Sequence, residues 1–524
     1  LAAADHLSSS FPNDGDEVAE MIATHLLEAY RVAPDDQLRT RTLTALRSAS
    51  RRAAAVGAPD AAERALRTAI GLADESERAE LIGSAAEMAE LAGRHEMALA
   101  LFEEARDALI AAARPEEAER LEGPISLALG RLGRQEESIA RMRVVTDSLD
   151  DDRIDAAGAV LLCELGRSLL FAGHSDEAGE VIERALTAAE ALEMPELICR
   201  LLNLKGGRAI DLCRYEEARA LYNGAIEIGE QFRLPVRASV HGNAADLSVK
   251  RDMPDAIEQC EAALATGRQL GNRAVETISL GNLMMARLLA GDWDEVERIG
   301  NEALESLDPG RSAAADIHFH LGLLAVRRGR DDEASEYLAR IAAWESGDDV
   351  EARQLYVGLD GLIALGEGDH PRALELLTDS VQQGMRAQGP SSEGTRLAWF
   401  DAVVAALELE RRGDATALVD LLEDQPTGLV PPLLRSALEH ARGLIGLRVG
   451  ESPEPHFRAA VAGLEKLGYP FWLARAQTDL GTWLADQGRR DEARPLLDEA
   501  EGLRRDLGMA SPLAPASAPR APAG

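Results

Sequence analysis

The sequence predicts an all-α protein, an α-solenoid of about twelve helical hairpins. Three observations support this fold class. Variants of the segment Leu165 to Leu186 return about every 40 residues along the 524-residue chain, apolar residues recur at helical spacing within the copies, and aromatic residues make up only 4% of the sequence. A lone hairpin cannot bury both of its faces, so neighbouring copies must stack against each other.

The clearest copy of the repeat contains two helices. Leu162, Leu165 and Leu169 fall at i, i+3 and i+7 on one face of a first helix, which ends at Gly173. A short polar turn follows, and a second apolar stripe begins at Ala178. Small residues in both helices allow close approach, so each copy is predicted to form an antiparallel helical hairpin.

The copies align on the small residue that opens each second helix. Glycine stands five positions before this anchor in eight of ten copies, as expected for a helix C-cap with left-handed backbone. Cys213 and Arg251 stand there in the other two copies. Alanine stands seven positions after the anchor in seven of ten copies, two turns further along the packed face. The ten anchors are Ala62, Ala98, Ser138, Ala178, Ala218, Ala256, Val296, Ala334, Ala373 and Ala493.

Periodicity and composition divide the chain into four segments. Residues 1–38 are a helical preface, expected to be a linker from an upstream domain, and residues 39–383 carry regular repeats. Residues 384–508 carry degenerate repeats followed by a regular terminal one, and residues 509–524 form a Pro/Ala tail predicted to be disordered. Within the third segment, 384–394 and 424–432 are rich in Gly, Pro and Ser and are predicted to be loops.

Charge and composition narrow the classes of partner. The net charge of −35 opposes the approach of a phosphate backbone, so nucleic acid is not an expected partner. No apolar run reaches the roughly 18 residues that a membrane span requires, so the chain is predicted to be soluble and to have no membrane partner. The four cysteines include no C-x-x-C pair, which predicts reduced, buried thiols in a cytoplasmic protein.

The sequence shows no constellation of catalytic residues. None of the three lysines is followed by Ser or Thr, so no G-x-x-x-x-G-K-[ST] phosphate loop is present. His318 and His320 are two apart on a predicted helix and point in different directions, so they cannot share a metal ion. We therefore expect no enzymatic activity, no cofactor and no metal site in this chain.

The turn motif resembles that of the tetratricopeptide repeat. A small residue near the middle of the first helix precedes a G-x-x-x-E-A turn, which reads GHSDEA at 173–178, GRDDEA at 329–334 and GRRDEA at 488–493. The resemblance covers about residues 40–508 and implies a right-handed superhelix of tetratricopeptide-like hairpins whose first helices line a concave groove. The period exceeds the usual length of about 34 residues. This longer form is similar to the repeats of large ATP-binding bacterial regulators and of kinesin light chains.

A second resemblance concerns the preface. The segment IATHLLEA at Ile22–Ala29 is similar to the segment that joins a STAND-type signal-transduction ATPase to its repeats, where I-A-x-H-Y-x-x-A is typical and where Leu26 now replaces the tyrosine. The resemblance implies that the chain is the regulatory C-terminal arm of a cytoplasmic ATP-binding signalling protein. The last repeat runs into the Pro/Ala tail, which favours a parent with an adenylate or guanylate cyclase domain. The alternatives are the sensor region of a LuxR-type transcriptional activator and a stand-alone protein–protein adaptor.

One polar pattern marks a candidate binding groove. Asn203, Asn243 and Asn282 recur at intervals of 40 and 39 residues in consecutive first helices. Asparagine carries both a donor and an acceptor and can pair with the backbone of an extended peptide. The three asparagines stand 15, 13 and 14 residues before their anchors, and each residue of shift is about 100° of helix rotation, so capping or inter-repeat hydrogen bonds are the alternative interpretation. The groove is predicted to bind a protein or peptide partner, or a small effector.

Overall fold

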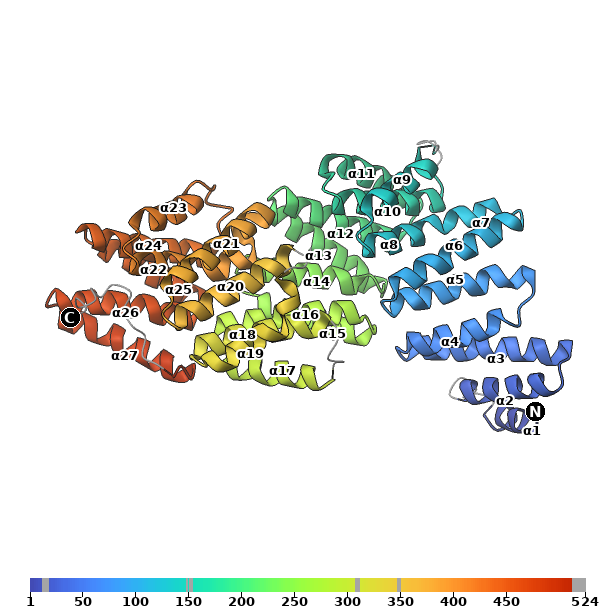
Figure 1. Ribbon diagram of the computed structural model, residues 1–524. Helices are drawn as coiled ribbons and strands as arrows, with labels where there is room; N and C mark the ends of the chain where they lie inside the picture. The colour runs from blue at the N-terminus through green and yellow to red at the C-terminus, as the bar shows by residue number, and fades with distance from the viewer. Residues whose placement is uncertain (12–17, 148, 150–153, 307–311, 346–349, 511–524) are drawn as a thin grey trace. The chain divides into compact units, whose positions relative to one another are not determined.

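The computed structural model describes residues 1–11, 18–147, 149, 154–306, 312–345 and 350–510 (Figure 1). Throughout these residues the regular structure is helical, with no strand, which confirms the predicted all-α fold class. Contacts divide the chain into two compact units, Leu1–Arg237 and Ala238–Gly524. Each unit is described by itself below.

The first unit contains the preface and five hairpins. Helices α1 and α2 form the preface, and the short helix α7 precedes the third hairpin. The helices are α1 (Ala2–Ser10), α2 (Ala19–Val32), α3 (Asp36–Ala55), α4 (Pro59–Ile70), α5 (Glu75–Leu91), α6 (His95–Ala111), α7 (Pro115–Arg120), α8 (Glu122–Arg131), α9 (Gln135–Thr146), α10 (Ala156–Phe171), α11 (Ser175–Ala191), α12 (Pro195–Asp211) and α13 (Tyr215–Gln231).

The second unit contains seven hairpins, so the described residues hold twelve in all and confirm the predicted solenoid. Its helices are α14 (Arg237–Lys250), α15 (Ala256–Gln269), α16 (Arg273–Ala290), α17 (Trp293–Ser306), α18 (Ser312–Arg328), α19 (Asp331–Arg340), α20 (Val350–Gly366), α21 (His370–Gln388), α22 (Glu393–Glu408), α23 (Arg412–Glu423), α24 (Pro432–Val449), α25 (Glu454–Leu467), α26 (Pro470–Asp486) and α27 (Arg490–Asp506), with 3-10 turns η2 (Ala342–Trp344) and η3 (Gly389–Ser391).

A small residue in the first helix meets a large side chain of the second helix within many hairpins. A Cβ atom at Gly206 of α12 would lie 2.4 Å from the ring of Tyr222 in α13. The same relation holds between Gly443 and Phe457, where the distance would also be 2.4 Å. Because real Cβ atoms do not approach this closely, glycine sets the separation of the two helices.

The predicted helix caps are confirmed at the eight positions where the repeats carry glycine. These glycines have φ between 72° and 89°, the left-handed conformation that a C-cap of this kind requires. In the two copies without glycine, Cys213 (φ 58°) and Asp252 (φ 52°) adopt the same conformation. Asp252, rather than its neighbour Arg251, is therefore the residue under backbone strain in that copy.

Two details of the sequence prediction need correction. The loop predicted at 384–394 is wrong over most of its length, because α21 continues to Gln388 and α22 begins at Glu393. Gly384 serves close packing instead, since a Cβ there would lie 2.5 Å from Thr395 Oγ1. Cys163, Cys199 and Cys260 are buried as predicted, whereas Cys213 lies in a turn and is exposed.

The other predicted loop, 424–432, does separate α23 from α24. Most of the tail predicted to be disordered, from residue 511 onward, lies outside the described residues. Its first two residues are described, and the Ala510 N–H donates to the Arg328 carbonyl oxygen at 3.1 Å.

Candidate functional site

The first helices of neighbouring hairpins pack directly against one another in both units. In the first unit α8 contacts α10 and α10 contacts α12, and in the second unit the same relation runs from α16 through α18, α20 and α22 to α24. In most hairpins the second helix packs against its own first helix and the first helix that follows, as α11 does against α10 and α12 and as α21 does against α20 and α22. In a solenoid, helices stacked in this way form the inner, concave layer, which is the usual binding surface.

An ionic strip links the first helices of the first unit. The Glu164 carboxylate in α10 accepts a hydrogen bond from Arg167 Nε at 2.8 Å and pairs with Arg200 of α12. Arg167 also donates to the Ser126 carbonyl oxygen of α8 at 3.2 Å. A Cβ at Gly130 would lie 2.9 Å from the Arg167 guanidinium, so this glycine lets the cation lie against the backbone of α8. The strip therefore couples three consecutive hairpins.

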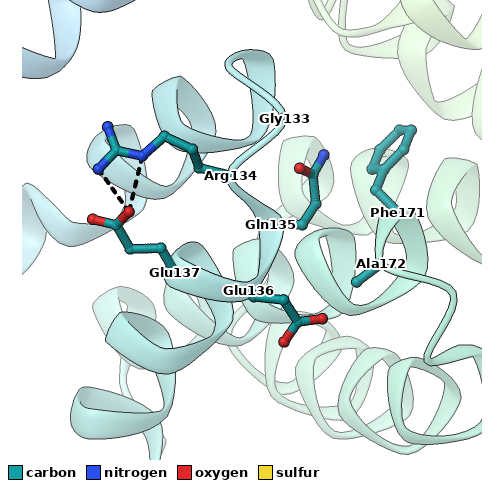
Figure 2. Close-up of a pocket in the computed structure, with 7 residues that line it drawn as sticks. All are labelled: Gly133, Arg134, Gln135, Glu136, Glu137, Phe171 and Ala172. Atoms are coloured by element: carbon teal, nitrogen blue, oxygen red, sulfur yellow. Dashed lines mark hydrogen bonds and ion pairs between the residues drawn. The ribbon is translucent and has the colours of Figure 1, made fainter. Parts of the chain in front are cut away.

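A surface hollow lies beside this strip, at the turn between α8 and α9 (Figure 2). Its volume is about 480 Å³. Phe171, a residue that is 67% exposed, faces the hollow on one side, and the Arg134–Glu137 ion pair lies on the other, as Figure 2 shows. The Arg167 guanidinium lies 6.0 Å from the centre of the Phe171 ring. An open hollow with one aromatic wall is better suited to binding a side chain of a partner than to binding a metabolite, which is usually held in an enclosed pocket.

In the second unit the inner layer is filled by charged side chains of the chain itself. The buried Asp401 of α22 pairs with Arg327 of α18 at 3.2 Å and with Arg475 of α26 at 2.8 Å. Burial would raise the pKa of Asp401, but the two guanidinium groups outweigh it and lower that pKa below its usual value. Arg327 also lies 4.5 Å from the centre of the Phe471 ring, so aromatic faces help to stabilise the cations.

A second charged cluster surrounds Lys250 at the end of α14. Its ammonium lies 3.2 Å from Asp246 and 3.5 Å from Glu351. Glu393 contributes a third carboxylate, which lies 3.9 Å from His320 Nε2. Burial, reinforced by the like charge of Glu351, raises the pKa of Glu393 to about 7. This carboxyl group therefore titrates near neutral pH.

A buried His–Asp pair in the second unit does not form a catalytic triad. His440 Nε2 lies 2.8 Å from Asp479, and the imidazole packs against the rings of Phe400 and Phe457. The nearby Ser436 hydroxyl donates to the Pro432 carbonyl oxygen at 3.1 Å and so is not directed to the imidazole. The pair is a structural contact between α24 and α26.

The three asparagines of the predicted groove lie on first helices. Asn203 is half-buried in α12 of the first unit, while Asn243 is exposed in α14 and Asn282 half-buried in α16 of the second unit. The buried Nδ2 of Asn282 has no hydrogen-bond partner among the described residues. Their role in a common groove remains a prediction.

The charged residues inside the second unit were not predicted as a site. One feature of the sequence could have indicated them: in one copy of the repeat, Arg251 and Asp252 stand where other copies carry the capping glycine.

Among the described residues, no group of three or more His, Cys, Asp or Glu side chains is arranged to hold a metal ion. Within the same part of the chain, none of the helices combines the length and the apolar character needed to cross a membrane.

The sequence matches no protein-family model, and no curated protein sequence is detectably similar to it. Solved structures of similar fold include the following three. The APC/C hetero-tetramer Cut9–Hcn1 is 13% identical, with 88% of this chain and 87% of that chain covered and a TM-score of 0.48. A Rap protein complexed with competence and sporulation factor is 12% identical (78% and 97% covered, TM-score 0.43). A monomeric IFIT1 mutant with Gppp-AAAA is 15% identical (74% and 90% covered, TM-score 0.41). At these identities the likeness concerns the fold alone.

Proposed function

We propose that this chain is a non-catalytic scaffold that binds a protein or peptide partner, or a small effector, on the first helices of its hairpins. The observation that carries the proposal is the continuous stack of α8, α10 and α12, with an ionic strip along it and a hollow beside Phe171. Charged side chains held between rigid helices, next to one exposed aromatic ring, provide both orientation and contact area for a partner segment.

The scaffold is further proposed to be the regulatory arm of a cytoplasmic ATP-binding signalling protein, linked to a nucleotide cyclase. Support comes from the IATHLLEA segment, which lies within α2. Leu26, the residue that replaces the typical tyrosine, is buried together with Ala23, so an apolar side chain at this position packs within the preface. Occupancy of the scaffold would then be reported to the ATPase through the preface.

Deletion within the parent protein tests this regulatory role. The reading frame upstream of Leu1 is sequenced for a Walker lysine and a cyclase core, and the parent is purified with and without residues 40–508. The expected result is a changed ATPase or cyclase output in the deletion variant. An unchanged output would contradict the regulatory role, and a frame that opens near Leu1 would favour a stand-alone adaptor.

The proposed groove is tested separately by capturing partners on the full chain. We expect a triple variant, N203A/N243A/N282A, to retain less of a captured partner than the wild type. The exposed Gln382 is a matched control, because Q382A removes an amide from a second helix, α21. If both variants retain equal amounts of the partner, the three asparagines are not part of the binding surface.

A further inference from the structure

The turn between α14 and α15 contacts elements that follow it by 140 or more residues. Asp252 accepts hydrogen bonds from the Leu433 N–H at 2.8 Å and from the Tyr469 hydroxyl at 3.1 Å, and its carboxylate also pairs with Arg396. These three donors come from α24, from the start of α26 and from α22. The first hairpin of the second unit is thereby joined to the fifth, sixth and seventh.

The neighbouring Arg251 binds the same region through its guanidinium. One nitrogen donates to the Ser391 hydroxyl and to the Leu429 carbonyl oxygen, both at 2.8 Å. The other donates to the Gly428 carbonyl oxygen at 2.7 Å. We call Arg251 and Asp252 together the closing turn, because every one of these contacts connects the beginning of the second unit to its later hairpins.

The groups around Asp252 form a built carboxylate site. A guanidinium, a phenolic hydroxyl and a backbone N–H in the first turn of α24 converge on one carboxylate, and each of these groups favours a negative charge. The Arg396 side chain is only 2% exposed, and its Nε has no hydrogen-bond partner among the described residues. A buried guanidinium with an unpaired hydrogen-bond donor is an independent indication that this site binds a group rich in oxygen acceptors.

The backbone of the closing turn is left-handed at Asp252. Its φ of 52° is the left-handed conformation that glycine supplies in eight other copies of the repeat. Among the described residues, other side-chain-bearing residues in turns adopt it too, so the backbone conformation does not by itself require an aspartate. What distinguishes Asp252 is its carboxylate, on which the three donors converge.

We propose that Arg396, Tyr469 and the Leu433 N–H form a recognition site for an aspartate or glutamate side chain of a peptide partner, which the closing turn occupies in its absence. The proposal rests on the peptide-binding function given above and names the chemistry of the peptide. Gly428, Leu429 and Ser391 prefer an arginine directly before that acidic residue, as in the closing turn itself. Because the closing turn is tethered to the site, it competes at a high effective concentration, and the partner binds only when the turn leaves.

The variant D252G of the full chain tests the proposal. Glycine adopts the required positive φ without strain, so the substitution removes the carboxylate and leaves the turn conformation accessible. The probe is a fluorescein-labelled, amidated peptide with the sequence of residues 249–256, VKRDMPDA. We expect it to bind D252G at least about tenfold more tightly than the wild type in fluorescence anisotropy, a difference of about 1.4 kcal/mol.

Two controls separate carboxylate recognition from general opening of the unit. The same peptide with its Arg-Asp aspartate replaced by asparagine should lose most of its affinity for D252G, and D252G/R396M should bind neither peptide. The control D255A alters an exposed aspartate of the same turn, whose carboxylate accepts from Gln259 at 3.2 Å, and should behave like the wild type.

Two outcomes would overturn the proposal: folded D252G that binds no more tightly than the wild type, or equal binding of the aspartate and asparagine peptides. If circular dichroism shows that D252G does not fold, D252N is used with the same criteria, since it keeps the volume of the side chain and removes its charge. The assay needs only this chain, so a negative result here is distinct from failure of the deletion test in the parent protein.

Discussion

The carboxylate of Asp401 in α22 lies 2.8 Å from the guanidinium of Arg475 in α26, two hairpins further along the chain. The same carboxylate pairs with Arg327 of α18, two hairpins earlier. One acidic side chain thus joins three non-consecutive first helices inside the second unit. A buried group of this kind is expensive to desolvate, and its stability depends on every partner being present.

We expect D401N to lower the free energy of unfolding of the second unit by about 3–5 kcal/mol, because it leaves two buried guanidinium groups without a counter-charge. Urea unfolding followed by circular dichroism measures the change. D420N, at an exposed aspartate of α23, is the control and should stay within about 0.5 kcal/mol of the wild type. Equal losses in the two variants would contradict the assigned role of Asp401.

The stability of the second unit is expected to depend on the ionisation of Glu393. Its pKa is raised from 4.5 to about 7, so the folded state favours the protonated form. The resulting stabilisation is complete below pH 4.5 and is lost as the pH rises through 7, a change of about 3 kcal/mol. His320, whose pKa is lowered by burial, acts in the opposite sense as the pH falls below its usual value.

The variant E393Q isolates this effect, since glutamine resembles the protonated side chain at every pH. We expect E393Q to be more stable than the wild type at pH 8 and the difference to shrink toward pH 5. Unfolding free energies measured at several pH values test this prediction. A constant difference between the two proteins across the range would rule out titration of Glu393.

Close packing within the hairpins predicts opposite effects for two glycines of the first unit. In G206A the new Cβ would lie 2.4 Å from the Tyr222 ring, so we expect a loss of about 1–3 kcal/mol. Gly224 of α13 has no atom within 4 Å of that position, so G224A should stabilise the helix by about 0.5–1 kcal/mol. Thermal unfolding of both variants gives the comparison, and a stable G206A would show that the hairpin can separate.

The four cysteines are expected to differ in reactivity. Burial raises the pKa of Cys163 and of Cys260 to about 12 and that of Cys199 to about 11, so their thiolate forms are scarce at neutral pH. Cys213 is exposed in a turn. Iodoacetamide treatment of the native protein followed by mass spectrometry should therefore modify Cys213 first. C213S should leave the native protein almost unmodified, and rapid labelling of Cys163 would instead indicate local opening of α10.

The net charge of −35 predicts that the chain does not retain nucleic acid. A fluorescein-labelled single-stranded RNA should show no increase in anisotropy with the full chain at about 0.15 M salt. The measurement is repeated with single-stranded RNAs of different sequence, because the charge argument does not depend on the bases. Saturable binding of any of these RNAs would contradict this prediction.

Much of the architecture could be predicted because the signals are local. The helical hairpins follow from apolar residues spaced by three and four positions, and Gly173 and its equivalents cap helices because φ must be positive there. The same local reasoning failed at Gly384, which packs inside α21 instead of reversing the chain, and at Cys213, which is exposed although cysteine is usually buried.

The sequence by itself determined the all-α class, the approximate number of hairpins and the positions of the eight glycine caps, because each of these depends on residues within one period. Only the tertiary structure decided that Asp252 meets Arg396 and Tyr469, and that Asp401 meets Arg327 and Arg475. These contacts depend on small rotations between successive hairpins, which add up over several repeats and bring distant first helices together. The accumulated rotation cannot be predicted from the residues of any single repeat.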